Sequence, residues 1–378
     1  MNARGFTLVE LLVASLLTLL VVAAAVAMAA SARQSFVVEP ATLDTVRRLR
    51  EGTEALAGAL TGAGGGHAVG DGVSSLASSV PLVRPMMSLA GAPGGRFTAL
   101  WVLRAIDGGL GRVALPQPGP AGSLTLDRAG SPCPLTTATC GFDVGDVAVV
   151  FDARGHFDVF QVANASDVLG RITPAAPLSY AYGAGAWVLT VRADRFGLVR
   201  QADGSHSLTR ITWAGAREPM VDGVVDVEIG AWGRALAPEV RDAATGPGLA
   251  QYGLHPPEPR EPDPDRVFPD GTHCMVARTG AVPSSRLGSY EPGAEGLVPL
   301  EPVDLSDGPW CPSNGSPGAW DADLFRLSRI DVRLRVEVQS AEFRGPAGRL
   351  FTRGGTASRN APSWVLDRTL VVSVAIDR

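Results

Sequence analysis

The sequence predicts an α+β protein in which a long N-terminal helix packs on an antiparallel β-sheet, with a long irregular segment inserted among the strands. Two observations lead to this fold class. Over residues 6–61 the apolar side chains first form a nearly continuous run and then recur at helical spacing. Most of the later sequence consists of short alternating patterns separated by Gly, Pro and Asp, which is typical of antiparallel strands with one solvated face.

The predicted organisation follows the order of the 378 residues. A chain of this length is sufficient for one large domain. The segments are a short leader at 1–5, an apolar helix at 6–32, its amphipathic continuation at 33–61, a β domain at 62–232, a Pro- and Gly-rich insertion at 233–323, and closing strands at 324–378.

The N-terminal apolar run is long enough to cross a membrane. No charged residue occurs from Leu11 to Ala32, and a helix over this stretch would extend about 33 Å. A cleaved secretory signal is the alternative, because Ala27, Ala29, Ala30 and Ala32 could mimic its cleavage site. The length of the run favours a membrane-spanning helix.

The start of the apolar run carries an unusual pattern. Gly5 directly precedes the sequence FTLV, and Glu10 follows inside the run. A carboxylate within an apolar segment is costly, and by default it indicates a functional role.

This N-terminal sequence, GFTLVE followed by a long apolar run, resembles the type IV prepilin signal over roughly residues 1–35. The resemblance implies that a prepilin peptidase cleaves between Gly5 and Phe6 on the cytoplasmic side, and that the new amine of Phe6 is methylated. Gly5 suits this cleavage because a side chain there would obstruct the peptidase. Glu10 would become the fifth residue of the mature chain, which is the family's usual place for this glutamate.

The expected role of Glu10 follows from the cost of burying charge. In a filament core of packed N-terminal helices, the ammonium of Phe6 and the carboxylate of Glu10 are each costly to bury alone. Pairing the two groups, within or between subunits, offsets part of both costs and penalises misplaced subunits. The alternative is a glutamate that only reaches toward the membrane interface.

A second helical pattern follows the apolar run. Its apolar stripe is predicted to dock on the sheet, or alternatively to face a partner helix. Pro40 should kink or briefly interrupt the helix, and the glycine-rich sequence from Gly62 to Gly72 should end it. The stripe consists of Val46, Leu49, Thr53, Leu56 and Leu60.

Short strands are predicted by alternation and by the turn residues that bound them. Between Trp232 and Trp320 this pattern fails, and Pro, Gly and acidic residues dominate. That segment is therefore predicted to be an irregular insertion with extended backbone. The predicted strands cover residues 97–104, 146–151, 157–162, 186–192, 196–200, 207–213, 221–229, 330–338 and 364–376.

The four cysteines allow three pairings. We predict the sequential one, Cys133 with Cys140 and Cys274 with Cys311, and four reduced cysteines are the alternative. Disulfides require an oxidising compartment, which agrees with an exported domain.

No cofactor or metal is predicted, with calcium within residues 256–323 as a weaker alternative. Calcium binds several oxygen ligands in turn-rich loops, but the acidic residues here do not have EF-hand spacing. A solvated acidic loop is the favoured interpretation. The acidic residues in question are Asp263, Asp265, Asp270, Asp321 and Asp323.

Composition and motifs argue against an enzyme and against nucleic-acid binding. The formal net charge is −5, lysine is absent, and the arginines are scattered without a basic stripe. The five histidines show no HExxH spacing, no GxSxG elbow occurs, and the glycines at 62–66 lack the lysine of a phosphate loop.

Residues 97–378 resemble the PilW-like minor pilins, with the type II secretion pseudopilin J family as a near relative. The long Pro-rich insertion departs from the family pattern, so its fold and role do not carry over. The segments that carry the resemblance are GDVAVVFD at 145–152, FDVFQVANAS at 157–166, WVLTVRADRFGLVRQADG at 187–204, PMVDGVVDVEIGAW at 219–232 and RIDVRLRVEV at 329–338.

The resemblance implies a structural subunit that primes or caps a type IV pilus. Its expected partners are other minor and major pilins, the prepilin peptidase and the inner-membrane assembly platform. The chain would cross the bacterial inner membrane once, with a cytoplasmic N-terminus and a periplasmic β domain, before it enters the fibre. The alternatives are a type II secretion pseudopilin, or a surface adhesin or ligand-binding module that uses residues 233–323.

Overall fold

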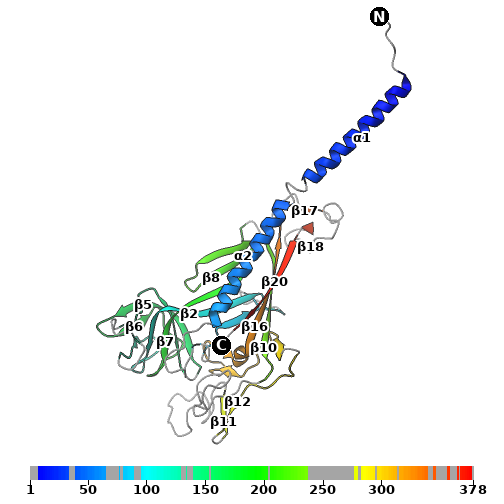
Figure 1. Cartoon of the computed structure of the whole chain (residues 1–378). Helices are drawn as coiled ribbons and strands as arrows, with labels where there is room; N and C mark the ends of the chain where they lie inside the picture. Colours follow the sequence, from blue (N-terminus) through cyan, green and yellow to red (C-terminus); the bar gives the residue numbers. More distant parts are fainter. Residues whose placement is uncertain are drawn as a thin grey trace.

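Two helices lie end to end in the computed structural model, and the second helix packs on a body formed mainly by two antiparallel sheets (Figure 1). This arrangement confirms the predicted α+β class. The residues that the structure describes are 7–33, 39–64, 76, 80–88, 95–128, 133, 139–152, 155–202, 205–236, 276–279, 282–293, 296–312, 315–338, 344–345, 356–357, 364–365 and 367–376.

The helical part consists of α1 (Leu8–Arg33) and α2 (Glu39–Gly64). Pro40 lies in the first turn of α2, where its missing amide removes no helical hydrogen bond. The proline therefore lies at the start of a second helix, which agrees with the predicted interruption near Pro40, and residues 34–38 lie outside the described residues.

The buried face of α2 differs from the predicted stripe at one position. Leu49, Leu56 and Leu60 are buried as expected, whereas Val46 is 44% exposed and Thr45 is fully buried. The hydroxyl of Thr45 donates to the carbonyl of Ala41, so its burial leaves no unmet donor. Position 45 lies four residues before position 49, which keeps the stripe on one helical face.

The glycine at position 52 lets α2 approach the sheets closely. A Cβ atom at Gly52 would lie 2.3 Å from Cγ2 of Val221 and 3.5 Å from Cδ2 of Leu334. Val221 belongs to the nine-stranded sheet and Leu334 to the four-stranded sheet, so α2 packs where the two sheets meet. Nearby, the Arg48 guanidinium donates to the carbonyl of Asp222 at 2.9 Å.

Replacement of Gly52 by alanine is expected to destabilise the protein by about 1–3 kcal/mol, because the new methyl group overlaps Val221. Gly58→Ala in the same helix is the matched control, since no heavy atom lies within 4 Å of its added Cβ. That control should be stabilising by about 0.5–1 kcal/mol. Urea unfolding of the detergent-solubilised chain measures both. Equal effects of the two substitutions would contradict the close helix–sheet contact.

The first sheet has nine strands, and β7, which pairs with β2, β4 and β8, joins its branches. The predicted strands at 186–192 and 196–200 form this one strand, because Ala193 and Asp194 pair with β2 without a break. Its members are β1 (Val83–Met86), β2 (Ala99–Arg112), β3 (Leu124–Thr125), β4 (Val147–Phe151), β5 (Phe157–Ser166), β6 (Arg171–Pro174), β7 (Trp187–Arg200), β8 (His206–Thr212) and β9 (Arg217–Asp222).

The predicted strand at 221–229 is divided between the two sheets. Strand β9 ends at Asp222, Gly223 adopts a φ of 71°, and the next strand begins at Val224. A left-handed backbone is accessible to glycine at little cost, so the chain can turn sharply there. The alternation of Val225, Val227 and Ile229 predicted strand content correctly but could not locate this turn.

The second sheet has the order β13–β10–β16–β20. Its inner face carries apolar residues in register, such as Ile229 opposite Val332 and Val227 opposite Leu334, and all four side chains are buried. The strands are β10 (Val224–Arg234), β13 (Leu297–Leu300), β16 (Leu327–Glu337) and β20 (Asp367–Ala375). The remaining short elements are β11 (Val276–Thr279), β12 (Val282–Ser285), β14 (Trp310–Cys311), β15 (Trp320–Asp321), the 3-10 helix η2 (Ala322–Arg326), β17 (Arg344–Gly345), β18 (Thr356–Ala357) and β19 (Trp364–Val365).

Part of the predicted irregular insertion at 233–323 is built into the body. Strand β13 pairs with β10, with Leu300 opposite Ala231. Trp320 is buried and donates its indole N–H to the carbonyl of Gly155 in the turn between β4 and β5. Because this segment is rich in Pro and Gly, its small apolar cluster was not indicated by the sequence. The cluster comprises Leu287, Cys311, Trp320, Ala322, Leu324 and Phe325.

A fully buried arginine connects this cluster to the second sheet. The guanidinium of Arg326 pairs with the carboxylate of Asp323 and lies 5.0 Å from the ring centre of Tyr290. Burial raises the pKa of Asp323 to about 6, although Arg326 opposes the shift. The same guanidinium donates to the carbonyls of Arg234, Ala235 and Gly288.

Candidate functional site

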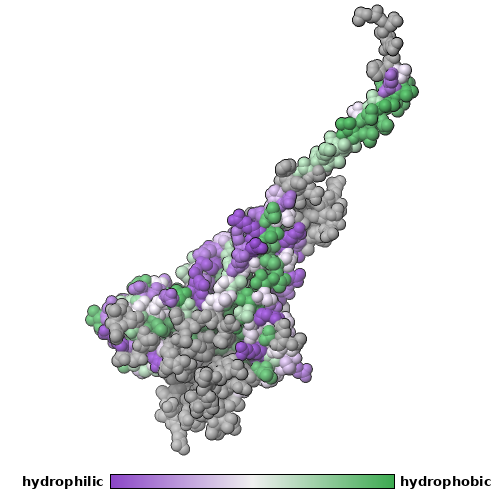
Figure 2. Space-filling model, in the orientation of Figure 1, coloured by the Kyte–Doolittle hydropathy of each residue, from purple (hydrophilic) through white to green (hydrophobic). Residues whose placement is uncertain are grey.

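Helix α1 presents mainly apolar side chains to its surroundings from Leu8 to Ala29. Residues Leu8–Ala29 have a mean hydropathy of 2.7, and the body of the protein buries none of them. Figure 2 shows this helix as a hydrophobic rod that projects from a mixed polar body. Length and composition make it a candidate membrane span.

Polar side chains inside α1 are satisfied by the helix itself. The hydroxyl of Ser15 donates to the carbonyl of Leu12 at 2.9 Å, and that of Thr18 donates to the carbonyl of Ala14 at 2.8 Å. An unmet donor would be costly in hydrocarbon. These bonds make α1 compatible with an apolar environment despite its hydroxyl groups.

Glu10 lies in the first turn of α1, where it forms a capping box with Thr7. The Glu10 carboxylate accepts hydrogen bonds from the Thr7 main-chain N–H at 2.9 Å and from the Thr7 hydroxyl at 3.0 Å. The hydroxyl oxygen in turn accepts from the N–H of Glu10 at 3.3 Å. This reciprocal pattern satisfies donors that a helix N-terminus otherwise leaves unpaired.

The sequence interpretation did not include this box, although the spacing Thr-x-x-Glu before an apolar run would have indicated it. Gly5 and Phe6, the predicted cleavage and methylation residues, lie outside the described residues. The predicted pairing of Glu10 with the amine of Phe6 therefore stays a prediction. The box holds the Glu10 carboxylate at Thr7, one residue along the chain from Phe6.

The predicted disulfide residues are placed in two regions. Cys133 and Cys140 are joined by a disulfide, and both are buried beside Phe142 in the lobe of β3 to β6. The carbonyl of Cys140 accepts from the N–H of Leu110 in β2, so the bonded loop is attached to the first sheet. Cys311 is also disulfide-bonded, whereas Cys274 lies outside the described residues.

The predicted calcium ligands that the structure describes have other roles. The Asp321 carboxylate accepts from the N–H groups of Gly308 and Asp323, and Asp323 pairs with Arg326. Asp263, Asp265 and Asp270 lie outside the described residues. Within the described ranges, no three metal-ligating side chains come together.

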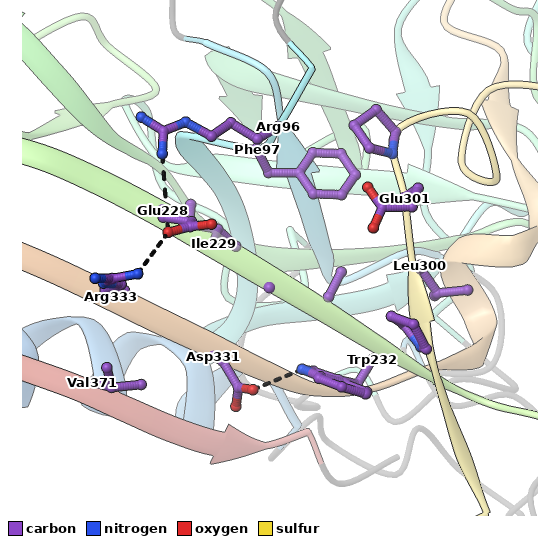
Figure 3. A pocket seen from close by; sticks show the side chains of 14 residues that line it. Arg96, Phe97, Glu228, Ile229, Trp232, Leu300, Glu301, Asp331, Arg333 and Val371 are labelled. Atoms are coloured by element: carbon purple, nitrogen blue, oxygen red, sulfur yellow. Dashed lines mark hydrogen bonds and ion pairs between the residues drawn. The ribbon is translucent and has the colours of Figure 1, made fainter. Parts of the chain in front are cut away.

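A groove of about 370 Å³ lies on the outer face of the second sheet. Figure 3 shows its floor along β10, with Phe97 and Glu301 at one side and Arg333 and Asp331 of β16 at the other. Gly230 leaves the floor open, since a Cβ there would already lie 3.4 Å from Cβ of Asp331.

Several polar and charged groups of this groove contact one another. The indole N–H of Trp232 donates to Asp331 at 2.7 Å, and Arg96 and Arg333 lie 3.9 and 3.5 Å from the Glu228 carboxylate (Figure 3). Arg96 also pairs with Asp226 at 2.8 Å. The Glu228 carboxylate of the groove thus lies between two arginines, and the Glu301 carboxylate is a further acid in the lining.

An exposed apolar helix that holds Glu10 in its first turn and is followed by a β body is consistent with a membrane-anchored, pilin-like protein. Comparison with known families supports this class. Residues 1–26 match the family model described as the prokaryotic N-terminal methylation motif, which supports a type IV pilin-like prepilin. No protein of curated function matches the chain.

Proposed function

We propose that this protein is a minor pilin of a type IV pilus, a PilW-like priming or tip subunit that a prepilin peptidase trims between Gly5 and Phe6. The observation that carries the proposal is the methylation motif at residues 1–26, followed by an apolar helix that the body leaves exposed. An exposed apolar helix of this length needs either a membrane or other such helices around it. In a pilin, this helix is surrounded first by the membrane and then by the helices of neighbouring subunits in the fibre.

In this proposal Glu10 selects correctly docked subunits. The capping box holds its carboxylate at the helix start, close in sequence to the amine that cleavage would create. Burial of either charge alone in a core of packed helices is costly, and their pairing offsets part of that cost. Other pilins, the prepilin peptidase and the inner-membrane platform are the partners that this role requires.

The β body is proposed to lie in the periplasm and then on the fibre, where it contacts neighbouring subunits and acts without catalysis. Its disulfide between Cys133 and Cys140 suits an oxidising compartment. In the groove, the pairing of Glu228 with Arg333 and the hydrogen bond from the Trp232 indole to Asp331 suit a structural surface better than a reactive site.

Deletion of the chromosomal gene is expected to abolish or strongly reduce surface fibres, because a priming subunit acts before elongation. Fibres counted by electron microscopy and secreted proteins measured in the same culture separate the two assembly systems. Loss of secretion with normal fibres would instead support the type II secretion pseudopilin.

An adhesive role for part of residues 233–323 is a second candidate. The hairpin of β11 and β12 lies at the end of the body opposite α1, which is where a tip subunit would meet its surroundings (Figure 1). Deletion of the whole segment would also remove β13 and Trp320 from the body. Replacement of residues 276–285 by a short Gly-Ser turn is the cleaner test, with loss of adhesion on intact fibres as the supporting result.

A further inference from the structure

Three arginines that are far apart in the sequence lie in one row across the first sheet. Arg84 of β1 is opposite Trp101 of β2, and Trp101 is opposite Arg195 of β7. Arg195 is opposite Ile211 of β8, which is opposite Arg217 of β9. Directly opposite residues point to the same face of a sheet. These five residues form an arginine row, in which arginines alternate with apolar side chains.

The arginine row has no acidic partner among the described residues. Arg195 and Arg217 are exposed, and the partly buried guanidinium of Arg84 lies 5.9 Å from the centre of the Trp101 ring. Within the part of the chain that the structure describes, none of the three arginines forms an ion pair. Burial lowers the pKa of Arg84 below its ordinary value, because the charged form loses contact with water. A carboxylate brought to this row would therefore be stabilising.

The opposite face of the same strands differs, because its arginines are neutralised. Arg192 pairs with Asp194 at 3.0 Å, and Arg210 pairs with Glu218. Successive side chains of a strand point to opposite faces, so these pairs lie on the other side of the sheet from Arg195. On the face of the arginine row, the adjacent row of residues carries no charge and cannot neutralise it. That adjacent row consists of Met86, Ala99, Gly197, Thr209 and Pro219.

The spacing of the arginine row fits one kind of extended peptide. Its arginines lie on alternate strands, and two strand separations amount to about 9.6 Å. In a polyproline II helix the side chains repeat every three residues, over about 9.3 Å. An acidic residue at every third position of such a segment would therefore place one carboxylate near each arginine. Prolines between the acids would contact the apolar side chains of Trp101 and Ile211.

The chain itself carries a sequence of this kind, PPEPREPDPD at 256–265, in which Glu258 and Glu261 are three residues apart. This segment lies outside the described residues, and no described carboxylate of the same chain pairs with the arginine row. We propose that the arginine row docks the acidic, proline-rich segment 256–265 of a second copy of this chain. This inference concerns association of the chain with itself and does not rest on the proposed role in a pilus.

The test is charge reversal on the two sides of this contact, in the detergent-solubilised full chain. One variant carries Arg195→Glu and Arg217→Glu, and the other carries Glu258→Arg and Glu261→Arg. Each variant alone should raise the dissociation constant of self-association about tenfold or more, because like charges then face each other. An equal mixture of the two variants should recover association, since the reversed charges attract again. Sedimentation equilibrium measures all three samples.

A control variant with Arg200→Glu and Arg368→Glu changes the net charge by the same amount at two exposed arginines outside the row. Its self-association should equal that of the unaltered chain. Urea unfolding of each variant checks that the fold is kept. Association through the apolar helix α1 is common to all samples, so recovery in the mixture reports the charged contact alone. The contact should also weaken as salt is added, because exposed charges are screened.

Three results would overturn the proposal. The first is self-association of the Arg195→Glu and Arg217→Glu variant that equals that of the unaltered chain, or a loss that the control variant shares. The second is a mixture that does not recover, which would place any contact of segment 256–265 within one chain or with another molecule. The third is an unaltered chain that stays monomeric at every concentration measured. None of these results bears on incorporation into fibres, so the proposed function is tested separately.

Discussion

Glu10→Leu is expected to abolish incorporation of the chain into fibres while its insertion into the membrane is unchanged. In the proposed fibre, removal of the carboxylate would leave the amine of Phe6 without a partner when the helices pack in an apolar core. An uncompensated buried charge costs about 3–5 kcal/mol. A difference of that size corresponds to about a hundredfold or greater loss of incorporation.

The same substitution lowers the polarity of α1, so membrane insertion should be at least as efficient as before. Quantitative blots of the membrane and sheared fractions measure both steps. Thr18→Val is the control, because it removes a hydroxyl that bonds only within the helix and leaves the capping box intact. Incorporation of Glu10→Leu at the level of Thr18→Val would contradict the role assigned to the carboxylate.

Arg326→Leu is expected to destabilise the body by about 3–5 kcal/mol, because it leaves the buried carboxylate of Asp323 without its cation. The carbonyls of Arg234, Ala235 and Gly288 also lose a donor. Urea unfolding measures the change. Arg333→Leu is the matched control, since that arginine is 59% exposed and its ion pair should contribute no more than about 1 kcal/mol.

The loss of stability caused by Arg326→Leu should depend on pH. Burial already raises the pKa of Asp323 above its ordinary value to about 6, and removal of the cation raises it further. A group with a raised pKa in the folded state stabilises the protein at low pH and loses that contribution as the pH rises. The deficit of Arg326→Leu should therefore be smaller at pH 5 than at pH 8. A deficit independent of pH would show that the Asp323 charge is not its source.

Periodicity predicted the elements that depend on local pattern. The uncharged run over 11–32 predicted α1, and regular alternation predicted β4, β5 and β16 to within a few residues. Periodicity could not decide which of two neighbouring residues lies on the buried face of a helix. The buried face of α2 includes Thr45 where Val46 was predicted. A threonine whose hydroxyl bonds to its own helix can be buried as readily as a valine.

Features that depend on contacts between distant segments were not predictable from one sequence. Gly52 meets Val221 and Leu334 only because two sheets converge on α2. Arg326 is buried because three separate segments supply its acceptors. The groove above Gly230 arises from the register of β10 with β16, which residue composition does not encode.

The most direct test of the account is the intact mass and N-terminal sequence of the protein isolated from membranes. The account predicts a mature chain that has lost residues 1–5 and begins at a Phe6 bearing one methyl group. A chain that still begins at Met1, or one cut after the apolar run, would contradict it.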